Sequence, residues 1–158
     1  MSCGVALAIS LLLTDPNVAL AADQPPALAG APVSVAGEPL FADIVQRAGA
    51  LRSVVGQWQA NLAGTPDWYM TPEAIGRFET ETTALAALDM QGHLVLKERG
   101  TDGDLKCILR GISEDIPVKV SAIRAAANPA ERRIALDELH YLLNDNVEVI
   151  TAPPQPPV

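Results

Sequence analysis

The chain has 158 residues, enough for one hydrophobic core but not for two. Apolar residues make up 49% of it and aromatic residues only 4%, a composition that favours packed helices over a β-sandwich. The formal net charge is −8 and no basic patch is present, which argues against nucleic acid or an anionic membrane surface as a partner.

Residues 1–21 have the pattern of a signal peptide. The apolar run 5–13 is too short to span a bilayer, and the small residues at 19–21 supply a cleavage site. No Lys or Arg precedes the run, so a buried first helix is the alternative. We expect export to the periplasm, or secretion, from a bacterial cell. Cleavage after residue 21 removes Cys3 and leaves Cys107 as the single cysteine.

Two segments rich in proline flank the expected domain. Residues 22–37 combine Pro, Ala and Gly without periodicity, which predicts a flexible leader. Residues 151–158, TAPPQPPV, favour a polyproline II tail. The folded domain should therefore span residues 38–150.

Helix start signals occur three times in this domain. Pro39 occupies a first helical position, Thr71 is a capping residue before Pro72, and Asn128 is a capping residue before Pro129. A proline costs nothing at that position because its missing N–H would have no partner in the helix, while the cap oxygen accepts from a free amide.

Apolar residues recur every three or four positions along four stretches, as on one face of a helix. The predicted helices span 39–63, 72–98, 104–127 and 129–150. Because the helices are similar in length and their links are short, neighbours must run antiparallel. The pattern predicts an all-α, up-down-up-down four-helix bundle. The strongest stripe consists of Phe41, Ile44, Ala48, Leu51, Val55, Trp58 and Leu62.

Two alternatives to this bundle stay open. Pro117 lies inside the third helix, where it favours a kink or a break that would give five helices. Residues 93–110 also contain short alternating runs, which would suit a β-hairpin and an α+β fold.

Motifs for chemistry are absent from the sequence. It has no haem-attachment, zinc-cluster, nucleotide-binding or hydrolase motif, so we expect no cofactor, no metal and no catalytic residue. In the bundle, His93 and His140 would lie about 15 Å apart along the axis, too far to share a metal. The polar positions on the apolar stripes are Thr82, Asp89 and Asn146, which form no acid, base and nucleophile set.

Candidate partner-binding residues lie in two places. Trp68, Tyr69 and Met70 are adjacent in the first link between helices, where they either cover the end of the core or contact a partner. Cys107 falls opposite the apolar stripe of the third helix, and Gly111 makes the surface one turn later shallow. Cys107 either lies beneath a second packing layer, forms an intermolecular disulfide, or is simply tolerated.

These features predict an exported, acidic accessory or binding protein that acts through protein–protein contacts in the cell envelope. Its partner would be an envelope protein or a second copy of the chain, with no membrane span after signal removal. The alternative is a carrier of a small apolar ligand with a cavity in the bundle near Trp58 and Phe78. An enzyme of unknown reaction is the third possibility.

Overall fold

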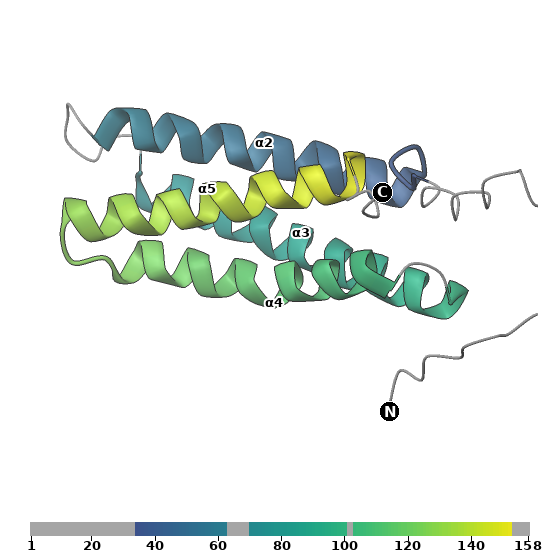
Figure 1. The fold of residues 1–158 in the computed structure, drawn as a ribbon. Helices are drawn as coiled ribbons and strands as arrows, with labels where there is room; N and C mark the ends of the chain where they lie inside the picture. The colour runs from purple at the N-terminus through teal and green to yellow at the C-terminus, as the bar shows by residue number, and fades with distance from the viewer. Residues whose placement is uncertain (1–33, 63–69, 101–102, 153–158) are drawn as a thin grey trace, which may run out of the picture. The chain divides into compact units, whose positions relative to one another are not determined.

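The computed structural model shows a bundle of four helices (Figure 1). The residues it describes are 34–62, 70–100 and 103–152. The helices are α2 (Pro39–Leu62), α3 (Pro72–Arg99), α4 (Gly103–Ala125) and α5 (Pro129–Thr151). Each bound lies within two residues of the one predicted, and the prediction of an all-α four-helix bundle is confirmed.

The four helices pack as a ring of neighbours. Helix α2 packs on α3, α3 on α4, α4 on α5, and α5 returns against α2, with each neighbour antiparallel (Figure 1). Helices α3 and α5 are therefore diagonal to each other, and their described residues have no close backbone approach. Of the four neighbouring pairs, α2 and α3 pack least closely.

The predicted caps form the expected hydrogen bonds. Thr71 Oγ1 accepts from the amide of Ala74 at 3.2 Å at the start of α3. At the start of α5, Asn128 Oδ1 accepts from the amide of Glu131 at 3.0 Å, and the Glu131 carboxylate accepts from the amide of Ala127 at 2.9 Å. This reciprocal arrangement uses two amides that the helix itself leaves unpaired, and so fixes the short link between α4 and α5.

The β-hairpin alternative for residues 93–110 is wrong, because both of its halves are helical. The reason is the burial pattern in this stretch. Leu105, Leu109 and Ile112 are buried at spacings of four and three, whereas Cys107, which a hairpin would place beside Leu105, is exposed. Helix α4 also continues through Pro117, so the bundle has no break there. The ring of Pro117 is exposed and displaces nothing in the core.

The core is a single cluster of aliphatic residues from all four helices, with few aromatic ones. Its fully enclosed side chains come from the predicted stripes. Those buried most completely include Phe41, Ile44, Val55, Leu85, Leu96, Leu109, Ile116, Leu136, Leu139, Leu143 and Ile150.

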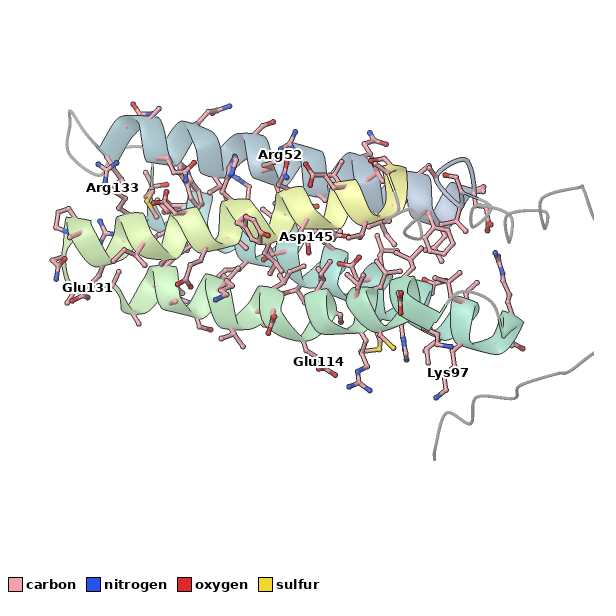
Figure 2. The ribbon with its side chains drawn as sticks, in the orientation of Figure 1. Arg52, Lys97, Glu114, Glu131, Arg133 and Asp145 are labelled. Atoms are coloured by element: carbon pink, nitrogen blue, oxygen red, sulfur yellow. The ribbon has the colours of Figure 1, made fainter. Side chains whose placement is uncertain are left out.

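The six charged side chains labelled in Figure 2 lie on the outside of the helices. Before α2, residues 34–38 make a turn in which the amide of Glu38 donates to the carbonyl of Val35 at 2.9 Å. Val35 and Ala36 of this turn pack against the core. The Glu38 carboxylate accepts two hydrogen bonds from the Arg99 guanidinium, at 2.8 and 2.7 Å, and so joins the start of α2 to the end of α3.

The core is closely packed around Gly92. A Cβ at this position would lie 3.1 Å from Leu109 Cδ1, 3.3 Å from Phe41 Cε1 and 3.5 Å from Ile44 Cδ1. Side chains of α2 and α4 therefore both pack against the backbone of α3 at Gly92. This close approach is possible because glycine has no side chain.

We expect Gly92→Val to lower the free energy of unfolding by about 1–3 kcal/mol, because the new methyl groups overpack this layer. Urea unfolding at neutral pH measures the change. Gly49→Val is the matched control, since a Cβ there meets nothing within 4 Å and the change should stay within about 0.5 kcal/mol. Equal effects of the two substitutions would show that the layer around Gly92 is not tight.

Candidate functional site

A groove of about 440 Å³ opens between α2 and α3, where these helices pack least closely. Ligand pockets in proteins fall in the same size range, about 300–1,000 Å³. Its apolar lining consists of Leu51, Val54, Trp58, Ala74 and Phe78. The groove lies at the surface, whereas the carrier alternative places a cavity near Trp58 and Phe78 inside the bundle.

The floor of the groove is formed by two aromatic rings. The ring centroids of Trp58 and Phe78 are 4.7 Å apart, with the planes tilted by 52°. Each residue is only 5% exposed, so the rings are held in place by the core beneath them. Tilted aromatic pairs at this separation attract each other beyond what their buried area contributes. The groove therefore has a rigid apolar base.

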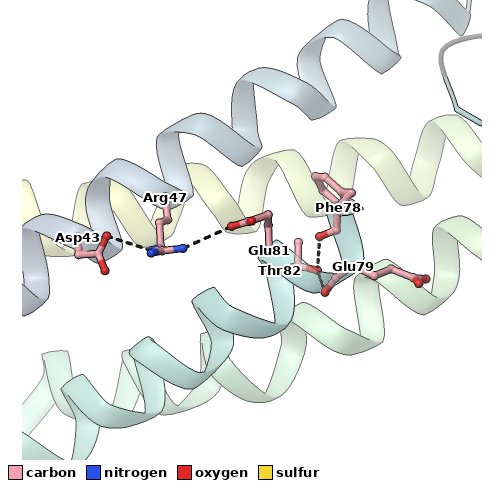
Figure 3. Close-up of polar contacts among 6 residues, drawn as sticks. All are labelled: Asp43, Arg47, Phe78, Glu79, Glu81 and Thr82. Carbon is pink, nitrogen blue, oxygen red and sulfur yellow. Dashed lines mark hydrogen bonds and ion pairs between the residues drawn. The ribbon is translucent and has the colours of Figure 1, made fainter. Parts of the chain in front are cut away.

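The rim of the groove carries three polar residues: Arg77, Thr80 and Glu81. Glu81 accepts from the Arg47 guanidinium at 3.3 Å across the two helices, and Arg47 also donates to Asp43 at 2.9 Å (Figure 3). The Thr80 hydroxyl donates to the carbonyl of Gly76 at 3.0 Å. The polar groups of Thr80 and Glu81 are thus already engaged within the protein.

Arg77 differs from its neighbours on the rim. It is exposed, and its guanidinium makes no hydrogen bond or ion pair with the residues that the structure describes. Its charge contributes, after the hydrogen bonds to the backbone of Glu73 and to Thr71, to a lowered pKa of Glu73 one turn earlier. The donors of the guanidinium stay available at the edge of the apolar floor.

A second feature, a buried polar pair, lies across the core. Asn146 Nδ2 of α5 donates to Asp89 Oδ2 of α3 at 2.9 Å, and both residues are 0% exposed. The other oxygen of each side chain, Asp89 Oδ1 and Asn146 Oδ1, is buried and finds no donor among the described residues. Thr82, the other polar position predicted on the stripes, is buried as well. Its hydroxyl donates to the carbonyls of Phe78 and Glu79 in its own helix (Figure 3).

Burial raises the pKa of Asp89 to about 8, while the hydrogen bond from Asn146 acts in the opposite direction. Desolvation prevails because, among the described residues, no interaction with a cation offsets it. Asp89 is therefore mostly protonated at neutral pH. The O–H that protonation adds is the kind of donor that the unpaired Asn146 Oδ1 lacks.

The predicted partner-binding residues have different surroundings. Trp68 and Tyr69 lie outside the described residues, while Met70 is buried in the core cluster. Cys107 is exposed with a free thiol, which rules out the packing layer suggested for it within the described chain. Gly111 is half-buried, and a Cβ there would meet nothing within 4 Å, so there is open space beside the helix at this position. The structure does not bring Met70 and Cys107 into one site.

The described residues hold no group of three His, Cys, Asp or Glu side chains that could bind a metal ion. His93 Nδ1 lies 2.6 Å from the carbonyl oxygen of Lys106, so this nitrogen carries the proton and donates. A second hollow, of about 340 Å³, lies between α4 and α5. It is lined mainly by alanines and has no aromatic residue in its lining. None of the helices seen in the described ranges has the length and apolarity needed to cross a membrane.

Sequence reasoning identified the two aromatic residues of the groove but missed its rim. Arg77 and Glu81 sit at the border of the second apolar stripe, beside Phe78 and Thr82. A charged residue flanking an aromatic one is a weak signal, because most such residues face solvent without a role. The two residues become candidates for ligand binding only because they line the groove between α2 and α3.

Comparison with protein-family models, with curated proteins and with solved structures found no match to this chain.

Proposed function

We propose that the chain is a binding protein and that the α2/α3 groove is its binding site. The observation that supports this most directly is a surface groove of about 440 Å³ whose lining includes the Trp58–Phe78 pair. A concave apolar site with a few polar groups at its edge is the usual form of a small-molecule site.

The chemistry of the groove favours binding over catalysis. Its polar groups are one guanidinium, one carboxylate already paired with Arg47, and one hydroxyl bonded to its own helix. None of these is an activated nucleophile, and no acid–base pair faces the floor. The buried Asp89 carboxyl is enclosed in the core, out of reach of a ligand in solution.

A role in the cell envelope is part of the same proposal. It rests on the signal-peptide pattern of residues 1–21 and on the net charge of −8. An exported carrier would move or hold an apolar molecule in an aqueous compartment, and the acidic surface would keep it apart from anionic membranes.

A protein partner is the second candidate, and the shallow surface of α4 favours it. Cys107 is exposed there and Gly111 leaves open space one turn later, so another helix can approach closely. The described residues of α4 include no aromatic anchor, which is why the groove comes first.

The test is binding of a neutral apolar fluorophore, N-phenyl-naphthylamine, to the full chain. We expect Ala74→Phe to weaken binding about tenfold or more, because the added ring fills the groove above Trp58. Fluorescence titration gives the Kd, and mass spectrometry of an organic extract of the protein would identify a co-purified ligand.

Ala87→Phe is the matched control, since Ala87 is an exposed residue of the same helix outside the groove. It should bind the fluorophore as the unmodified protein does. If Ala74→Phe and Ala87→Phe bind equally well, the groove is not the site.

A further inference from the structure

We propose that the α2/α3 groove binds a fatty acid, with the acyl chain on Trp58 and Phe78 and the carboxylate on the guanidinium of Arg77. This inference rests on the proposed function and names its ligand class. It follows from the charges on the rim, from the polar groups that the groove lacks, and from its dimensions.

The pairing of the charged groups on the rim favours an anionic head group. The Glu81 carboxylate is held by Arg47, whose guanidinium is also bonded to Asp43, so both carboxylates are paired although they share one positive charge. Arg77 makes no hydrogen bond or ion pair with a described residue, and its charge helps to lower the pKa of Glu73 one turn earlier. The groove therefore presents one uncommitted cation, and a ligand with a negative head group complements it.

A guanidinium binds a carboxylate especially well, because its planar donors match the two carboxylate oxygens. At the edge of an apolar groove this contact loses less to water than it would on an open surface. The head group would stay at the rim, next to solvent, while the apolar part of the ligand covers the rings.

The lack of free polar groups inside the groove selects an acyl chain over a peptide. A peptide brings an N–H and a C=O with every residue, and each needs a partner when it is buried. The Thr80 hydroxyl is bonded to Gly76 and the Glu81 carboxylate to Arg47, while the floor is hydrocarbon and aromatic. An acyl chain needs no such partners.

The dimensions suit a chain of medium length. The lining covers eight residues of each helix, from Leu51 to Trp58 and from Ala74 to Glu81, which is seven steps along the axis. At 1.5 Å per residue this is about 10 Å.

A second copy of this protein is a poor occupant, because it would bring a further net charge of −8 to the interface.

The test compares three probes of equal chain length by isothermal titration: decanoate, decanol and decyltrimethylammonium, each below its micelle concentration. We expect decanoate to bind the full chain about threefold to tenfold more tightly than decanol, in line with a partly screened charge contact. Arg77→Gln should remove this difference, and Arg77→Lys should retain part of it.

Arg133→Gln is the matched control, since it removes the same charge from the exposed face of α5 (Figure 2). It should leave the preference for decanoate unchanged. Equal affinity for decanoate and decanol in the unmodified protein would overturn the assignment to Arg77 while leaving a binding groove. Tighter binding of the ammonium probe would overturn it too, and would point to Glu81.

Two further outcomes would overturn the proposal in other ways. If none of the three probes binds, the proposed function fails together with the ligand class. If sedimentation shows a dimer that Ala74→Phe abolishes, the groove is covered by a second copy of the chain.

Discussion

Between pH 5 and pH 8 the free energy of unfolding should fall by about 1.4 kcal/mol for each pH unit because of Asp89 alone. Burial raises the pKa of Asp89 from the ordinary value of 3.8 to about 8. In this range the folded protein holds a proton that the unfolded chain releases. The stabilisation is complete below pH 4, and it is lost as the pH rises to the folded pKa.

Urea unfolding across this range, compared between the unmodified protein and Asp89→Asn, measures the effect. The asparagine has the shape of the protonated acid and does not titrate, so its stability should depend on pH much less. Asp115→Asn is the control, because Asp115 is exposed and removing its charge should leave the pH dependence in place. Parallel curves for the unmodified protein and Asp89→Asn would show that Asp89 is ionised in the fold.

Other acids set the lower limit of the window. The pKa of Glu38 is lowered mainly by its hydrogen bond with Arg99, and that of Glu73 mainly by hydrogen bonds to its own backbone and to Thr71. Their stabilisation is present above the ordinary value of 4.5 and is lost as the pH falls below it. They act in the opposite sense to Asp89, which is why the comparison begins at pH 5.

Asn146→Leu should cost about 2–5 kcal/mol of stability at pH 7, because it leaves the Asp89 carboxyl buried without a partner. Asp89→Leu should cost less, since a neutral amide remains in place of an acid. The double substitution Asp89→Leu/Asn146→Leu should recover most of the loss, because two apolar side chains then face each other. A double-mutant cycle from urea unfolding gives the coupling energy directly.

Thr82→Val serves as the control for this cycle. It also replaces a buried polar side chain, but the Thr82 hydroxyl bonds only to carbonyls of its own helix. We expect a cost of no more than about 1 kcal/mol, with no coupling to Asn146. If the losses at Asp89 and Asn146 simply add, the two side chains do not depend on each other and the pair has no structural role.

The helices could be predicted from the sequence because their signals are local. Each capping residue and each proline acts within a few residues, as Thr71 and Asn128 do, and the apolar period extends through every helix. Continuity at Pro117 was harder to predict. A proline removes one hydrogen bond, but whether the helix bends or breaks depends on the packing of its neighbours.

The two candidate features could be predicted only in part, because they depend on distances between helices. The sequence identifies Asp89 and Asn146 as polar positions on apolar stripes. Their contact, however, joins two residues that are 57 positions apart in the sequence and lie on diagonal helices. The groove depends on how closely α2 approaches α3, and no local pattern near Arg77 records that distance. The carrier hypothesis named Trp58 and Phe78, which both line the groove, because they belong to facing stripes.

The ring of neighbours also determines when the fold can be completed during synthesis. Contacts of α3 with α4 and of α4 with α5 join consecutive segments, so they close short loops and form readily. The contact of α2 with α5 joins the first helix of the bundle to the last. The apolar face of α2, with Phe41 and Ile44, is therefore only partly covered until α5 has emerged from the ribosome. A nascent chain of this protein reaches its native core only when the final helix arrives.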